Sequence, residues 1–369
     1  MASIQHLLEC GQSLWLDYVD RNLITGGGLE RLVDEGLRGV TSNPTIFHQA
    51  ITGTDAYDEA ILDLIQADHE VDGELLYEWL AIQDIQMACD RLLPVYEQTH
   101  GADGFVSIEV SPHLAHDANA TIDQARHLWR SVHRDNVLIK VPATREGLFA
   151  IETLIAEGIN VNVTLLFSVS RYREVFAAYT RGVAQNNDPH GVASVASFFV
   201  SRIDSAVDPK LDGAGQQGAP YKSRAAIANA KMAYQAFLEM RQGSEFRAQQ
   251  KRGARVQRPL WASTSTKDPA LPDTLYVDNL VGPDTVNTVP PGTLDAFVAH
   301  GTAAVTIDDY LEAARETLNA LPSFGIDLER VTAHLEADGV QKFVDSHDAL
   351  VQALHEKLLD ITARYAAES

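Results

Sequence analysis

The stretch Asn136-Val-Leu-Ile-Lys-Val-Pro-Ala-Thr144 decides how the fold of this 369-residue chain is interpreted. Its branched apolar residues follow one another without alternation, as in a strand that is buried on both faces of a parallel sheet. Pro142 lacks the N–H that a strand ladder needs, so we expect the strand to end close to it. Lys140 would then lie near the carboxyl end of a buried strand.

Lys140 is the only charged residue of this stretch, and the nearest carboxylates in the sequence are Asp135 and Glu146. One interpretation is a strand-end lysine whose ammonium reaches solvent along its apolar stem. The other is a partly desolvated amine on the catalytic face of an α/β barrel, where it can form a Schiff base with a ketone. The other strands of the chain are needed to choose between them.

Seven further segments have the composition of short strands, and helical patterns follow nearly all of them. The expected strands are 13–19, 39–43, 105–112, 136–144, 159–167, 193–204, 258–264 and 284–292. The expected helices are 29–35, 54–69, 73–96, 121–133, 148–157, 170–181, 225–240, 294–300, 309–321, 328–338 and 346–365. No GxGxxG turn follows the first strand, so an α/β fold of the TIM (β/α)8 barrel type with extra helices is favoured over a doubly wound sheet. Because no change in composition marks a linker, we expect one barrel domain over residues 1–369.

The composition argues against several classes of protein, among them nucleic-acid-binding, membrane and secreted proteins. The charged residues give 29 − 51 = −22, so binding to duplex nucleic acid or to an anionic membrane is not expected. The two cysteines, Cys10 and Cys89, have no CxxC spacing, which fits a reducing compartment and gives no metal framework. Neither a signal peptide nor an apolar run of about 18 residues is present, and a cytoplasmic protein is expected.

Each of the first three expected strands contains a polar residue within or at the end of its apolar run. Asp17 lies within the first strand, and Glu109 lies between two apolar residues of the third. Burying such a carboxylate is costly unless it is paired or lies at a barrel mouth. Asn43 precedes Pro44, which forces an extended or turn geometry that can project the amide at a strand end.

The later strands repeat this pattern. Asn160, Asn162 and Thr164 share one face of the fifth strand, which we expect to point into the barrel or toward its mouth. The sixth strand carries Ser197 and Arg202. After the seventh, hydroxyl side chains precede Lys267, an arrangement that suits a phosphate group.

His113 and His116 follow the third strand at a spacing of three residues. Two histidines alone do not make a metal site, because further ligands must come within range. The favoured interpretation is therefore a polar loop, and no metal is expected.

Four segments together resemble the transaldolase family, Schiff-base enzymes of the pentose phosphate pathway. They are Lys140-Val-Pro-Ala-Thr144, Glu157-Gly-Ile-Asn-Val-Asn-Val-Thr-Leu-Leu-Phe-Ser168, Ile108-Glu-Val110 and the Thr-Ser-Asn-Pro run that ends at Pro44. The resemblance extends over nearly the whole chain, and the length is similar to that of the bacterial branch with longer chains.

The resemblance implies roles for the polar residues above. Lys140 would form the imine, Asp17 would be the acid/base group of the cleavage step, and Glu109 with Thr164 would relay protons through a water. The substrate-binding residues that it implies are Asn43, Asn162, Ser197, Arg202, Ser263 and Lys267. Members of the family have Ser-x-Arg after the seventh strand, whereas this chain has Ser263-Thr-Ser-Thr-Lys267, so Lys267 would replace the arginine.

The implied reaction transfers a dihydroxyacetone unit from sedoheptulose 7-phosphate to glyceraldehyde 3-phosphate, giving erythrose 4-phosphate and fructose 6-phosphate. Sugar phosphates would be the binding partners of a monomer or homodimer. No cofactor is implied, because a protonated imine withdraws electrons by itself. Two alternatives stay open: a Schiff-base aldolase that cleaves fructose 6-phosphate without transfer, and a sugar-phosphate-binding barrel without catalysis.

Overall fold

Eight parallel strands close into a barrel at the centre of the computed structural model, which describes residues 4–67 and 71–368. Each strand pairs with the next one along the chain, and the last pairs with the first. The strands are β1 (Gln12–Leu16), β2 (Gly39–Val40), β3 (Phe105–Glu109), β4 (Val137–Pro142), β5 (Val161–Leu166), β6 (Ser194–Phe199), β7 (Arg258–Ala262) and β8 (Thr285–Val289). The predicted TIM barrel is confirmed, with all eight strands in the expected order.

The register of the central strands places three predicted site residues at one level. Glu109 on β3 pairs with Lys140 on β4, and Lys140 pairs with Asn162 on β5. Residues in register on neighbouring strands point to the same side of a sheet. Lys140 lies two residues before the end of β4 at Pro142, so its side chain is close to the carboxyl end of the barrel, as predicted.

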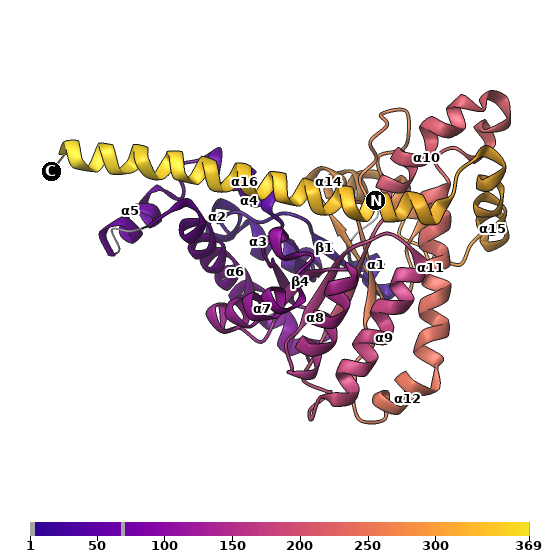
Figure 1. Ribbon diagram of the computed structural model, residues 1–369, viewed down its shortest axis with the longest axis horizontal. Coiled ribbons are helices and arrows are strands. Elements are labelled where there is room, and N and C mark those ends of the chain that lie inside the picture. The colour runs from indigo at the N-terminus through magenta and orange to yellow at the C-terminus, as the bar shows by residue number, and fades with distance from the viewer. Residues whose placement is uncertain (1–3, 68–70, 369) are drawn as a thin grey trace.

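Helices surround the barrel (Figure 1). They are α1 (Ile4–Glu9), α2 (Arg21–Thr25), α3 (Gly28–Glu35), α4 (Pro44–Thr52), α5 (Asp58–Ala67), α6 (Gly73–Gln98), α7 (Ala118–Val132), α8 (Arg145–Ala156), α9 (Val169–Gln185), α10 (Ser201–Gly213), α11 (Ala225–Gln242), α12 (Ser244–Gln250), α13 (Leu275–Asn279), α14 (Pro291–His300), α15 (Leu311–Ala320) and α16 (Leu328–Glu368). Residues 68 and 69 of the expected helix 54–69 lie outside the described residues. None of the helices in the described part of the chain has both the length and the apolar character of a membrane span.

Helix α16, yellow in Figure 1, runs across the barrel and packs against α4, α6 and α10. The sequence predicted two helices here, 328–338 and 346–365, and that prediction was wrong. Between them lies Gly339, and glycine disfavours a helix by about 1 kcal/mol relative to alanine. A Cβ on Gly339 would come within 2.9 Å of the Leu165 side chain. The glycine thus lets α16 approach the end of β5 closely, and it does not end the helix.

Most strands end earlier than predicted, and two of these ends change the placement of a site residue. The expected sixth strand, 193–204, is shorter, because β6 ends at Phe199 and α10 begins at Ser201. Arg202 consequently lies in the first turn of a helix and not on the strand. The first strand ends at Leu16, so Asp17 follows the strand instead of lying within it. After β6 the apolar run continues through Val200, and after β1 the apolar residues Tyr18 and Val19 follow Asp17, so the sequence pattern placed both strand ends too late.

Candidate active site

A pocket of about 390 Å³ opens among the carboxyl ends of the barrel strands and the loops that follow them. This is the face on which barrels of this type build their active sites. The predicted site residues that line it are Asp17, Asn43, Lys140, Thr164, Ser197, Arg202, Ser263 and Lys267. The other two, Glu109 and Asn162, are buried directly beside the lining residues.

Lys140 is 5% exposed, so its ammonium does not reach bulk solvent as a surface lysine would. Its Nζ donates a hydrogen bond to the backbone carbonyl of Ser42 at 3.0 Å and lies 3.9 Å from Oε2 of Glu109. The amine therefore faces the pocket with one neutral and one acidic neighbour.

Glu109 is buried, and its Oε2 has no hydrogen-bond partner among the described residues. Burial raises the pKa of Glu109 to about 7; the nearby Lys140 charge opposes the shift and the Asp17 charge adds to it. A carboxyl with that pKa can both accept and donate a proton near neutral pH, which is what a proton relay requires.

Asp17 is held where β1 meets β8. Its backbone N–H donates to the carbonyl of Val289 at 2.8 Å, and its Oδ1 accepts from the Thr41 hydroxyl at 2.7 Å. The Thr41 and Thr288 hydroxyl oxygens are 2.7 Å apart, and both threonines line the pocket. Sequence reasoning missed these two threonines, although both lie within expected strands; in the structure Thr41 directly follows β2 and Thr288 is the penultimate residue of β8. One oxygen of the carboxylate is thus fixed, and the group is aimed at the pocket.

Thr164 lies at an irregularity in the barrel. The pairing of β5 with β6 shifts register between Val163 and Leu166, and Leu165 has a left-handed backbone with φ of 57°. Such a conformation is costly for a branched residue and is typical of functional sites. The Thr164 hydroxyl is fully buried and has no protein partner among the described residues, so it is free to bind a water or a substrate hydroxyl.

The two asparagines differ in what they can offer a ligand. Asn43 caps α4, and its Oδ1 accepts from the backbone N–H of Ile46 at 3.0 Å, which leaves its amide N–H₂ for the pocket. Asn162 is buried in a network below the pocket wall. Its Oδ1 accepts from Ser197 Oγ at 2.6 Å, and its Nδ2 donates to Ser107 Oγ at 3.0 Å. Asn162 therefore orients Ser197, which lines the pocket.

Two cations, Arg202 and Lys267, line the same pocket. The Arg202 guanidinium packs 5.1 Å above the Phe199 ring, and burial lowers the pKa of Arg202. Burial, and then the positive charge of Arg202, also lower the pKa of Lys267. Among the described residues neither cation forms an ion pair, and Nη1 of Arg202 is buried without a hydrogen bond. An anion between them would relieve their repulsion.

Hydroxyl groups lie beside these cations. Ser265 Oγ accepts from Lys267 Nζ at 2.8 Å. Ser263 has a left-handed backbone with φ of 54°, its carbonyl accepts from the N–H of Ser201 at 2.9 Å, and its Oγ lies 3.0 Å from Ser201 Oγ. The loop after β7 is thereby joined to the start of α10.

The structure separates the two histidines of the loop after β3. His116 pairs with Glu146 at 3.3 Å, whereas His113 lies beside Asp348 on α16. The same helix brings Phe343 into the pocket lining. No pattern in the sequence indicated that a helix from the end of the chain would contribute to this site.

The family model described as "Transaldolase/Fructose-6-phosphate aldolase" matches residues 14–354, a span that contains all ten predicted site residues. The chain belongs to this family. It is an enzyme family, and the predicted family is confirmed.

Curated relatives resemble the chain over almost its whole length. The transaldolase of Acidothermus cellulolyticus is 47% identical over 361 residues, covering 96% of each chain. "Transaldolase 2" of a Nostoc strain is 44% identical over 376 residues, covering 96% of this chain and 98% of its own. The transaldolase of Thermobifida fusca is 46% identical over 362 residues, covering 96% and 98% respectively. All three carry the transaldolase name and not the aldolase name, in agreement with the predicted function.

Proposed function

We propose that this member of the transaldolase family transfers a dihydroxyacetone unit from sedoheptulose 7-phosphate to glyceraldehyde 3-phosphate, giving erythrose 4-phosphate and fructose 6-phosphate. The observation that carries the proposal is the buried Lys140 ammonium, which lies 3.9 Å from Glu109 at the wall of a pocket that also holds Asp17. An amine sequestered from solvent beside a proton acceptor is the arrangement that a Schiff-base lysine needs.

The first half of the reaction forms an imine. Glu109 accepts a proton from the Lys140 ammonium, and the neutral amine then attacks the ketone carbon C2 of the donor sugar phosphate. The carbinolamine loses water to give a protonated imine. Glu109 supplies the proton for that departure through a water held by the free hydroxyl of Thr164.

The second half breaks and remakes a carbon–carbon bond. Asp17 takes the proton of the C4 hydroxyl, the C3–C4 electron pair moves into the imine, and the aldose phosphate leaves. The resulting enamine on Lys140 adds to the aldehyde carbon of the acceptor, whose oxygen regains the proton from Asp17. Hydrolysis of the new imine releases the product ketose and restores the amine.

The remaining residues hold the substrate. The N–H₂ of Asn43, whose oxygen caps α4, and the hydroxyl of Ser197, which donates to Asn162, would bind hydroxyls of the retained three-carbon unit. The cations Arg202 and Lys267 would bind the distal phosphate together with the Ser263 loop. Both unpaired charges lie in the pocket that also exposes the reactive amine.

We further propose that residues 1–369 form a single barrel domain. We propose that the enzyme acts in the cytoplasm as a monomer or homodimer. Support comes from the continuous order of strands and helices along the chain. The charge of −22 also makes nucleic acid an unfavourable partner.

Acceptor dependence separates transfer from simple cleavage. Purified enzyme is given fructose 6-phosphate with and without erythrose 4-phosphate, and the release of glyceraldehyde 3-phosphate is measured. A transaldolase turns over steadily only when the acceptor is present, whereas an aldolase releases free dihydroxyacetone at the same rate without it. A binding protein shows no turnover in either case. Lys140→Met, which keeps the length of the side chain and removes the amine, is the control for contaminating activity.

A further inference from the structure

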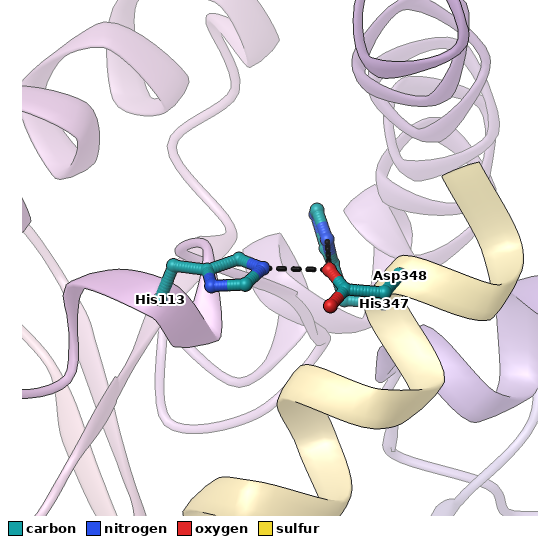
Figure 2. Close-up of side chains that lie close together, drawn as sticks. All are labelled: His113, His347 and Asp348. Carbon is teal, nitrogen blue, oxygen red and sulfur yellow. Dashed lines mark hydrogen bonds and ion pairs between the residues drawn. The ribbon is translucent and has the colours of Figure 1, made fainter. Parts of the chain in front are cut away.

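Three side chains that commonly bind metal ions meet beside the barrel, outside the pocket: His113, His347 and Asp348 (Figure 2). His113 belongs to the short helix η1 (Pro112–Leu114) after β3, and the other two are neighbours on α16. Nε2 of His113 lies 2.7 Å from Oδ1 of Asp348, and Nδ1 of His347 lies 3.8 Å from the same oxygen. One ligand atom from each residue falls within 4.8 Å of the others.

His347 shows that this cluster is more than a chance contact of surface groups. It is 3% exposed, yet neither ring nitrogen has a hydrogen-bond partner among the described residues. Leaving a buried polar group unpaired is costly, and native proteins rarely do so without a reason. Nδ1 faces Asp348, and Nε2 lies 3.4 Å from Oε1 of Glu74 on α6.

We propose that His113, His347 and Asp348 bind one divalent transition-metal ion, and that zinc is the ion that fits them. Two imidazole nitrogens and one carboxylate oxygen form a ligand set that zinc accepts, with a water in the fourth position. Magnesium and calcium prefer oxygen ligands and are disfavoured here. The Glu74 carboxylate behind His347 occupies the place of the acceptor that orients a metal-bound imidazole through its other nitrogen.

The cluster is open to an incoming ion. The side chains of His113 and Asp348 are 48% and 60% exposed, so they can reorient without disturbing the core. Ligand atoms bound about 2.0–2.1 Å from a tetrahedral ion lie roughly 3.3 Å apart. The present separations require the two exposed side chains to move by about an ångström, and the ion replaces the proton shared by His113 and Asp348.

A bound ion would connect two parts of the chain that are far apart in sequence. Helix η1 follows the strand that carries Glu109, and α16 carries Phe343 of the pocket lining one turn before His347. None of the three proposed ligands lines the pocket in the described part of the chain. The ion would therefore hold α16 against the mouth of the barrel.

The test uses the full, untagged chain after chelator treatment, because an added histidine tag would bind zinc. Zinc chloride is titrated in competition with a chromogenic chelator, and the number of bound ions is read from the mass of the native protein. We expect one ion per chain for the wild type. His113→Ala and Asp348→Asn, which change exposed side chains, should each weaken binding by more than about tenfold. Glu74→Gln should weaken it about ten- to a hundredfold, as loss of an orienting partner does.

His116→Ala is the matched control, since it removes a histidine of the same loop that pairs with Glu146 and lies outside the cluster. It should bind zinc as the wild type does, and excess magnesium should not compete. Zinc should also slow hydrogen exchange of residues 340–350 in the wild type but not in His113→Ala. If the wild type binds no zinc, or if His113→Ala and Asp348→Asn bind it as tightly as His116→Ala, the proposed site is refuted. No substrate is present, so the result is independent of the proposed transaldolase activity.

Discussion

Glu109 and Lys140 occupy paired positions on β3 and β4, and Oε2 of the carboxyl lies 3.9 Å from Nζ of the lysine. Both side chains are almost fully buried. Burying either charge alone would be costly, so the pair offsets part of that cost and provides a short path for a proton. The parallel register fixes this relationship, because any shift of β4 by one residue would turn Lys140 to the other face.

Borohydride should trap a dihydroxyacetone adduct on Lys140 when the enzyme is incubated with fructose 6-phosphate. The amine faces the pocket and is shielded from solvent, so it is the group placed to meet a ketone there. Peptide mass mapping locates the adduct, and Lys140→Met should give none. An adduct on a different lysine would rule out the proposed Schiff base.

Asp17→Asn should leave imine formation largely intact and slow carbon–carbon cleavage by about 10² to 10⁴. Asparagine keeps an oxygen for the Thr41 hydroxyl, which donates to Asp17 at 2.7 Å, but it cannot accept the proton of the C4 hydroxyl. Trapping yield and turnover are compared on the same preparation. A parallel fall in both would assign Asp17 to the imine step or to folding.

The barrel could be predicted from local pattern, and polar residues at strand ends together with the family resemblance indicated most of the residues that line the pocket. Runs of branched apolar residues predicted strands such as β4 and β5. A polar residue near the end of such a run indicated a position at the pocket. Arg202 was predicted on a strand because Val200 continues the apolar run past Phe199, and Ser201 was not recognised as the start of α10. Its true position, in the first turn of a helix, depends on packing and not on local composition.

The contribution of α16 could not be predicted, because it depends on contacts between residues far apart in the chain. Phe343 enters the pocket and His347 meets His113 only after the helix has crossed the barrel. Gly339, which lowers the local helix propensity, proved to be the residue that permits the crossing. A pattern of a few residues carries no information about partners more than 200 positions away.

The stability of the enzyme should depend on pH through Glu109, whose pKa burial raises from 4.5 to about 7. The folded state favours the neutral form, so this contribution is complete below pH 4.5 and is lost as the pH rises through about 7. Relative to Glu109→Gln, the wild type should lose up to roughly 3 kcal/mol of unfolding free energy across that window. Urea unfolding of the wild type and of Glu109→Gln at pH 5 and pH 8 measures this loss. If the difference in unfolding free energy between the two proteins is the same at both pH values, the raised pKa is contradicted.

Arg202 and Lys267 should select for the phosphate of the substrate. A lost hydrogen bond to a charged group costs roughly 1.5–3 kcal/mol, which is about ten- to a hundredfold or more in kcat/KM. Arg202→Ala should therefore impair fructose 6-phosphate far more than unphosphorylated fructose. Lys267→Ala should show the same bias but a smaller one, because an ammonium is a less directional partner than a guanidinium.

For each variant, kcat/KM for fructose 6-phosphate is divided by kcat/KM for fructose, and this ratio is compared with that of the wild type. Poor folding lowers both values equally and leaves the ratio unchanged. Lys251→Ala, an exposed cation at the end of α12, is the matched control and should leave the ratio unchanged. High salt should reduce the preference for the phosphorylated sugar only slightly, because Nη1 of Arg202 is buried and screening acts mainly on exposed charges. Equal losses on both sugars for Arg202→Ala would place its role in packing against Phe199 and not in phosphate binding.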